Sequence, residues 1–134
     1  MLTGMKMIPA YRLLRVKRAN PWTLFHKFHE SRQLPYNKEL RAVEEQVWNP
    51  GKKEKGPGFI SGWHVILDRD ECVEYLQRFT DKSDIVIAKV HVARLRPKPR
   101  ATSNVHLARY MKIDVWDWAL DKSRKLHSER HLYT

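Results

Sequence analysis

Cysteine is nearly absent from the sequence, which has one thiol, Cys72, in 134 residues. A single cysteine excludes an intrachain disulfide and leaves too few thiolates for a cysteine-based zinc site. Cys72 occupies an apolar position of a predicted helix, so we interpret it as a core residue. The composition fits a reducing compartment, and we expect a cytoplasmic protein.

Long apolar runs are also missing. No stretch approaches the ~20 apolar residues that a membrane-spanning helix requires, and the segment 1–10 lacks the apolar core of a signal peptide. We therefore expect no membrane partner. The sequence has no glycine-rich phosphate loop, and it implies no cofactor. It also offers no recognisable Ser-His-Asp order of a catalytic triad. These absences favour binding over catalysis and leave enzymatic activity open.

Acidic residues are in short supply. The chain has 26 Lys and Arg residues against 15 Asp and Glu residues, which leaves a formal net charge of +11. Such a charge attracts nucleic acid, anionic lipid or an acidic protein face. The alternative is that the charge serves only solubility.

The chain is long enough for one hydrophobic core and too short for two. Hydrophobic residues make up 42% of it, and five are tryptophans, which argues against global disorder. We expect an N-terminal segment over 1–10, a single domain over 11–121 and a frayed basic tail over 122–134.

Alternation of apolar and polar residues predicts two strands near the start, over 11–18 and 22–29, joined by a turn at Asn20-Pro21. A short helix is the alternative for the second. The segment 34–48 fits a helix or an edge strand, and we favour the strand. Glycine, proline and lysine concentrate over 49–58, which predicts an exposed loop.

The second half of the chain is more regular. An apolar run predicts a strand over 59–67, and a helix follows from an N-cap at Asp68 to about Thr80. β-branched residues over 84–93 predict the central strand. Prolines then favour an extended basic loop over 94–100.

The last predicted elements are a long strand over 105–115 and a helix over 114–125. Strands that outnumber helices and do not alternate regularly with them are typical of the α+β class. We therefore predict a single small α+β domain. It would contain a mainly antiparallel twisted sheet of about five strands, one packed helix and a C-terminal helix.

The tripeptide Gly62-Trp63-His64 is the most distinctive local feature. A glycine before an aromatic residue lets two backbones approach closely, and His64 can donate, accept or transfer a proton near neutral pH. The alternative is a packed structural histidine. If the protein is an enzyme, the candidate catalytic residues are His64 as general base and Lys89 as amine nucleophile, beside Arg109.

Arg109 falls between Leu107 and Met111 on the expected apolar face of its strand, where an unpaired charge is costly. Three explanations are open. A bulge turns the side chain outward, an acidic residue such as Glu71 or Glu74 pairs with it, or it lines an anion pocket.

Basic residues follow the central strand. Lys89 and His91 are expected on one of its faces, and Arg94 and Arg96 on the other. With the basic first strand beside them, they would form a concave surface near His64. A solvated sheet face is the alternative.

Such a surface would suit phosphate contacts, with Trp22, Phe25 or Trp48 as stacking faces for bases. The candidate nucleic-acid-binding residues are Arg12, Arg15, Lys17, Arg18, Lys89, His91, Arg94, Arg96, Lys98, Arg100 and Arg109.

Seven histidines raise the question of a metal site. The best pair is His127 and His131, four residues apart in the predicted tail with Glu129 between them. No Cys or Asp spacing of the zinc kind accompanies them. We predict no metal site.

The order of the segments 11–16, 58–64 and 70–76, followed by a Val/Ile strand, resembles small uncharacterised tailed-phage accessory proteins. Those proteins carry a G-W-H or G-F-H strand before a short helix. The resemblance covers about residues 11–115. It implies an accessory protein in a bacterial host cytoplasm, of the kind that disables or redirects host enzymes.

Three functional hypotheses follow. The first is an accessory protein whose basic face binds nucleic acid, or a host enzyme bound to nucleic acid, and alters host DNA metabolism or defence. The second is an inhibitor that docks on an acidic host protein through the aromatic anchors Trp116 and Trp118. The third is a small nucleic-acid-cleaving or lyase enzyme. The oligomeric state is left open.

Overall fold

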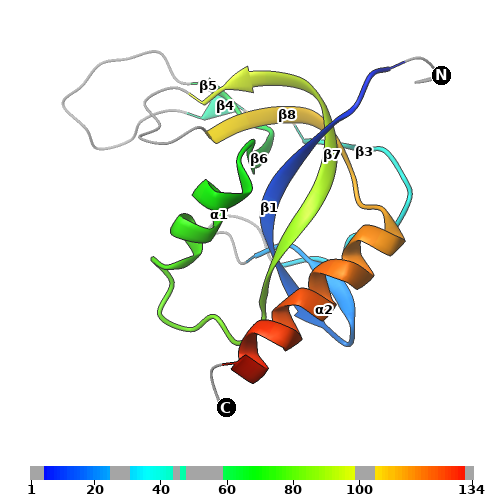
Figure 1. Cartoon of the computed structure of the whole chain (residues 1–134). Helices are drawn as coiled ribbons and strands as arrows, with labels where there is room; N and C mark the ends of the chain where they lie inside the picture. The colour runs from blue at the N-terminus through cyan, green and yellow to red at the C-terminus, as the bar shows by residue number, and fades with distance from the viewer. Residues whose placement is uncertain (1–4, 25–30, 44–45, 48–58, 99–104, 132–134) are drawn as a thin grey trace.

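Strands dominate the described part of the chain, and every strand pairing in it is antiparallel (Figure 1). The computed structural model describes residues 5–24, 31–43, 46–47, 59–98 and 105–131. Its elements are β1 (Ile8–Lys17), β2 (Asn20–Trp22), β3 (Leu40–Arg41), β4 (Gln46–Val47), β5 (Phe59–Ile60), β6 (Trp63–Ile66), α1 (Arg69–Leu76), β7 (Ile85–Pro97), β8 (Val105–Lys112) and α2 (Val115–His131).

Four of these strands pair in a ring, so the main sheet closes on itself. β1 pairs with β7, β7 with β8 and β8 with β6, and β6 returns to β1 through the single pair Tyr11↔Ile66. β2 extends the ring beside β1, and β3 extends it beside β8. The predicted α+β class with a mainly antiparallel sheet is confirmed. The main sheet has six strands where about five were expected.

The turn after β1 lies earlier than predicted. Arg18 and Ala19 both have positive φ, 52° and 67°, and Asn20 and Pro21 belong to β2. The predicted turn at Asn20-Pro21 is therefore wrong. Two residues with positive φ match the right-handed twist of paired strands, and a proline is tolerated on a short edge strand.

The predicted strand over 22–29 is confirmed only at Trp22, since Thr23 and Leu24 follow β2 without strand structure. Residues 25–30 lie outside the described part, as does the predicted loop over 49–58. For the segment 34–48, the preference for strand over helix is confirmed in two short pieces, β3 and β4.

The strand predicted over 59–67 is interrupted. Ser61 and Gly62 separate β5 from β6. A Cβ on Gly62 would lie 2.9 Å from the carbonyl oxygen of Ala108 on β8. The close backbone approach predicted for this glycine is confirmed, and it brings β6 against β8.

Helix α1 begins as predicted and ends earlier. The Asp68 side chain caps it by accepting a hydrogen bond from the Asp70 N–H at 2.9 Å. The helix ends at Leu76, because the N–H groups of Gln77 to Phe79 bond to carbonyls three residues back, as in a 3₁₀ turn. The predicted end near Thr80 is wrong by about one turn.

Strand β7 is central, as predicted, because it pairs with β1 on one side and β8 on the other. The predicted loop over 94–100 is wrong, since β7 continues to Pro97 and pairs Leu95 with Ala108. Pro97 is the last residue of the strand, where its missing N–H disturbs the sheet least. Residues 99–104 lie outside the described part.

The boundary between β8 and α2 also differs from the prediction. The strand ends at Lys112, and the Asp114 side chain caps α2 by accepting from the N–H groups of Trp116 (3.0 Å) and Asp117 (2.9 Å). The helix then continues to His131. The helix predicted over 114–125 is therefore confirmed from Val115, and it continues through residues 126–131, which were predicted only as a frayed tail. None of the described helices is long and apolar enough to cross a membrane.

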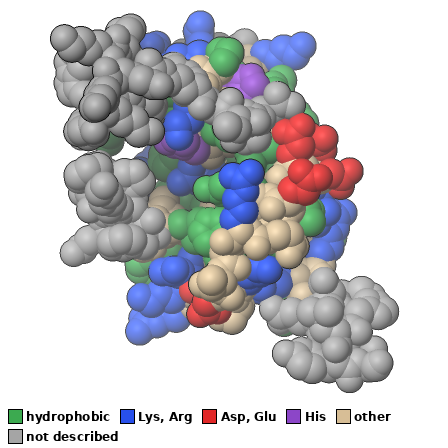
Figure 2. Space-filling view, turned by 90° about the vertical axis from the view of Figure 1, so that its left-hand side faces the viewer, with side chains coloured by type: hydrophobic (Ala, Val, Ile, Leu, Met, Phe, Trp, Pro, Cys, Tyr) green, Lys and Arg blue, Asp and Glu red, His purple; other side chains and the backbone are tan. Residues whose placement is uncertain are grey.

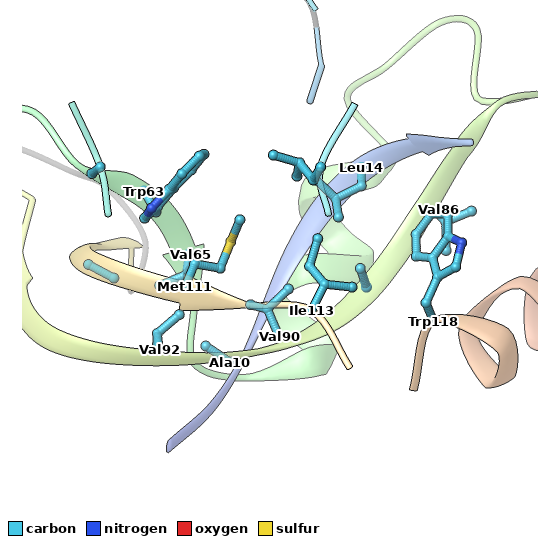
Figure 3. Packing of buried hydrophobic residues seen from close by; sticks show 14 residues of the cluster. Ala10, Leu14, Trp63, Val65, Val86, Val90, Val92, Met111, Ile113 and Trp118 are labelled. Atoms are coloured by element: carbon cyan, nitrogen blue, oxygen red, sulfur yellow. The ribbon is translucent and has the colours of Figure 1, made fainter. Parts of the chain in front are cut away.

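The buried side chains form two hydrophobic clusters. Successive residues of β1, Leu13 and Leu14, belong to different clusters, because neighbouring side chains of a strand point to opposite faces. Figure 3 shows the larger cluster, in which side chains of the ring strands meet and Trp118 of α2 lies beside Val86. Cys72 is fully buried in the smaller cluster, which confirms it as a core residue.

Candidate nucleic-acid interface

Six cationic residues belong to segments that meet at one end of the molecule. Three chain segments meet there, in the lower part of Figure 1: the β1–β2 turn, the loop between α1 and β7, and the C-terminal half of α2. We name this group the basic end. It consists of Lys17, Arg18, Lys82, Lys122, Arg124 and Lys125.

Hydrogen bonds between the three segments position these cations. The carbonyl oxygen of Ala19 accepts from Trp118 Nε1 at 2.9 Å and from Lys122 Nζ at 3.0 Å. Lys125 Nζ donates to the carbonyl oxygen of Lys82 at 3.0 Å. The turn and the loop are thus both tied to α2, and the amines of Lys122 and Lys125 are held by tertiary contacts.

The acidic residues near the basic end are largely neutralised. Asp84 forms an ion pair with Arg15, with 2.7 Å between Oδ2 and Nε. Asp121 is buried, burial raises its pKa, and its carboxylate accepts the Lys89 backbone N–H at 2.8 Å. Asp81 is exposed, and hydrogen bonds from Ser83 lower its pKa. An excess of positive charge therefore remains at this end.

An aromatic ring lies beneath one of the cations. Lys17 Nζ is 4.7 Å from the ring centroid of Trp22, within the range of a cation–π contact. Trp22 is half-buried. Of the three predicted stacking residues it is the only one in the described part of the chain, since Phe25 and Trp48 lie outside it.

The structure gives Arg12 an internal position. Its Nη1 donates to the carbonyl oxygen of His64 at 2.9 Å, and its guanidinium lies 5.5 Å from the ring centroid of Trp63. Burial, together with the nearby charge of Arg32, lowers the pKa of Arg12 to about 10. Arg12 bridges β1 and β6 rather than extending to solvent.

Lys89 and His91 lie among acidic residues of α2. The Lys89 backbone donates to Asp121, and His91 Nδ1 is 3.9 Å from Asp117 Oδ2. His91 also lines an open cavity of about 340 Å³ together with Met5, Met7, Glu39, Lys112 and Asp114. The carboxylates reduce the positive potential here, so these two residues do not continue the basic end.

The other predicted residues of β7 are distributed along the strand. At ~3.3 Å per residue, Arg96 is about 20 Å from Lys89. Arg96 Nη2 donates to the carbonyl oxygen of Ser61 at 2.9 Å, Arg94 is exposed, and burial lowers the pKa of Lys98. Arg100 lies outside the described residues.

The described members of the predicted concave surface, Lys89, His91, Arg94 and Arg96, are therefore spread along β7 rather than gathered in one group. Figure 2 shows one face of the molecule, on which Lys and Arg side chains form several separate groups with hydrophobic side chains between them.

Arg109 occupies a point where the alternation of β8 breaks. Ala108 and Met111 are three residues apart but belong to the same core cluster. Leu107 and Met111 therefore point to opposite faces, and the prediction that they share one face with Arg109 is wrong. Arg94, across the sheet, has a positive φ of 60° and interrupts the pairing at this position. Arg109 is half-buried there.

The candidate catalytic residues lie on different strands. His64 is half-buried on β6, Lys89 is on β7, and β1 pairs with both strands between them. Among the described residues, no three His, Cys, Asp or Glu side chains gather as a metal ion would require. The side chains of His127 and His131 are not part of the description.

Sequence reasoning missed four members of the basic end: Lys82, Lys122, Arg124 and Lys125. Three of them fall where the predicted helix over 114–125 overlaps the predicted tail over 122–134, and none was named as a binding residue. A helical spacing from Trp118 through Asp121 to Lys125, with the first two buried, indicates that Lys125 lies on the inward side of α2, but it does not indicate which segments it meets there. No protein-family model, no curated protein and no solved structure matches this chain, so no residue role is carried over from another protein.

Proposed function

We propose that the protein is a non-enzymatic binding protein that contacts nucleic acid through the basic end. One observation carries this proposal: three distant segments that together carry six cations are tied to one another, while the acidic residues beside them are largely paired or buried. Lys and Arg side chains that neutralise phosphates release counterions, which provides most of the affinity for a nucleic acid backbone. The net charge of +11 adds long-range attraction.

The fixed positions of several of these side chains favour a binding surface over a merely solvated one. Lys17 is held over Trp22, and the amines of Lys122 and Lys125 are hydrogen-bonded to backbone carbonyls. A lysine amine has three donors, so the Lys122 amine can donate to a phosphate oxygen as well as to the carbonyl of Ala19. Side chains that are already ordered lose less conformational entropy when they bind.

The expected contacts are mainly to the phosphate backbone. Trp63 and Trp118 are buried, with 6% and 1% of their surface exposed, and are not available to stack on bases. Trp22 is partly accessible beneath Lys17. Phosphate contacts position a protein without selecting a sequence, so we propose weak sequence preference.

The resemblance to tailed-phage accessory proteins supports a setting for this activity. The target would be nucleic acid, or a host enzyme bound to nucleic acid, in a bacterial cytoplasm. Binding there would alter host DNA metabolism or defence.

Fluorescence anisotropy with labelled single- and double-stranded DNA and with RNA tests the proposal at 50–200 mM salt, the range over which phosphate contacts lose most affinity. A double variant, Lys17→Gln with Arg18→Gln, removes two cations of the basic end. The matched control, Arg41→Gln with Arg94→Gln, removes two exposed cations elsewhere and lowers the net charge equally.

The first variant should lower the slope of log affinity against log salt by about 2, and the control should leave it nearly unchanged. Equal losses in the two variants, or binding that ignores salt, would overturn the proposal.

A further inference from the structure

The outward side of α2 is mainly apolar over its first three turns, residues 115–126; farther along, His127 and Arg130 fall on the same side of the helical projection. Trp116 is 77% exposed, Leu120 56% and Leu126 59%. At 100° per residue, Trp116, Ala119, Leu120, Ser123 and Leu126 fall within an arc of about 120°. We name these five residues the α2 outer face. The opposite side of the helix carries Trp118 and Asp121, which are buried against the sheet.

This pattern is unusual for a surface helix, whose outward side is normally polar. The other large exposed hydrophobic residues lie singly on separate segments: Val43, Leu67 and Tyr75. Scattered apolar residues need no explanation, whereas a contiguous exposed strip marks an interaction site. The α2 outer face is such a strip.

Cations border the strip toward its C-terminal half. On the helical projection Lys122 falls at one edge of the α2 outer face and Arg124 at the other. The β1–β2 turn with Lys17 and Arg18 is joined to Lys122 through the carbonyl of Ala19. An apolar strip with a basic border is complementary to an apolar groove with an acidic border.

We propose that the α2 outer face docks into an apolar groove with an acidic rim on a partner protein. Trp116 would be the central anchor, since exposed tryptophans dominate the energetics of such contacts, and the mode would be a helix laid in a groove. A second copy of this chain is disfavoured as the occupant, because both copies carry a net charge of +11. The inference goes beyond nucleic acid binding, since it depends on uncharged side chains.

The isolated N-terminal lobe of Ca²⁺-loaded calmodulin serves as the probe, because it is acidic and presents an open, methionine-lined groove that closes without Ca²⁺. Isothermal titration calorimetry compares the full-length wild type with two double variants. Trp116→Ser with Leu120→Ser disrupts the α2 outer face. Val43→Ser with Leu67→Ser is the matched control at exposed apolar positions elsewhere.

The wild type and the control should bind the Ca²⁺-loaded lobe equally, and neither should bind the Ca²⁺-free lobe. The Trp116 and Leu120 variant should bind at least ~10-fold more weakly, as expected for loss of a hot-spot anchor. Both positions are exposed, so its melting temperature should equal that of the wild type. If the melting temperature of the double variant is lower than that of the wild type, Leu126→Ser is the independent variant, and it should also bind the lobe more weakly.

Failure of the wild type to bind the lobe, or equal binding by both double variants, would overturn the proposal. Binding to phosphatidylglycerol vesicles without binding to the lobe would also overturn it. So would a wild-type dimer in sedimentation equilibrium if the Trp116 and Leu120 variant is monomeric. Nucleic acid affinity and its salt slope should be unchanged in that variant. Failure of this proposal is thus distinguishable from failure of the proposed function.

Discussion

The guanidinium of Arg12 donates from Nη1 to the carbonyl oxygen of His64, 2.9 Å away, and so links β1 to β6 beside their single backbone pair. Backbone pairing between these strands is limited to Tyr11 and Ile66. A side chain therefore supplies the next hydrogen bond across the seam of the ring, and it lies over the buried ring of Trp63. This position accounts for an arginine within an otherwise apolar strand face.

Replacing Arg12 by alanine should lower the free energy of unfolding by about 2 kcal/mol, because the hydrogen bond from Arg12 to the His64 carbonyl and the cation–π contact with Trp63 are both lost. Urea denaturation followed by circular dichroism measures the change. Arg41→Ala, at an exposed position of β3, is the control and should change stability by less than about 0.5 kcal/mol. Equal midpoints for the two variants would contradict the bridging role.

Replacing Gly62 by alanine should destabilise the fold by about 2 kcal/mol, since the new Cβ would lie 2.9 Å from the backbone oxygen of Ala108 and would force β6 from β8. Thermal unfolding monitors the effect. The neighbouring Ser61→Ala removes the exposed hydrogen bond from the Ser61 hydroxyl to the carbonyl of Val43, and it should cost less than about 1 kcal/mol. A Gly62→Ala protein as stable as the wild type would show that β6 and β8 can separate without penalty.

Asp121 should make stability fall as pH rises through its titration. Burial raises its pKa above the ordinary 3.8, against the opposing Lys89 hydrogen bond. Between 3.8 and the raised pKa the folded state holds more protons than the unfolded state, so stability decreases with increasing pH. The Asp121→Asn variant lacks this titration. Its unfolding free energy, measured by urea denaturation, should therefore increase relative to that of the wild type as pH rises from acidic to neutral.

Asp81 provides a control of opposite sign. Hydrogen bonds from Ser83 lower its pKa, so its carboxylate stabilises the fold above 3.8 and this contribution is lost as pH falls through the folded pKa. The unfolding free energy of the Asp81→Asn variant should therefore decrease relative to that of the wild type as pH rises. The same sign for both variants would refute the assignment of Asp121 as a buried carboxylate.

The Cys72 thiol should be unreactive in the folded protein. It is fully buried, and burial raises its pKa to about 12. Because the thiolate is the reactive form, a disulfide reagent at pH 8 should label native protein at least ~100-fold more slowly than protein in urea, by way of transient opening. Labelling of Cys72 within seconds in native buffer would contradict the buried position of this thiol.

Local structure was predictable where one pattern dominated the segment. The β-branched run beginning at Ile85 predicted the central strand, and the Asp68 cap predicted the start of α1. Element ends were less predictable, because they depend on partners elsewhere. β7 continues through Arg94 to Pro97 since β8 pairs with it there, and neither the basic residues nor the proline indicate that partner.

The candidate site was predictable only in part. Lys17 and Arg18 were identified from the basic first strand, whereas Lys122 and Lys125 join them through contacts that no local window contains. Ala19 lies 99 residues from Trp118 and 103 from Lys122, to which it is hydrogen-bonded. Conversely, Arg12 was predicted at the interface, whereas the tertiary structure places it between β1 and β6, where it is bonded to the His64 carbonyl.

The sequence by itself determined the net positive charge, the single thiol, the α+β class and most of the segments that become strands or helices, because these follow from composition and short-range periodicity. Only the tertiary structure decided which side chains share a surface. Trp116 and Trp118 appeared equivalent as anchors, yet they lie about 160° apart around one helix. The sheet covers one side of α2, so Trp118 is 1% exposed in the core and Trp116 is 77% exposed to solvent.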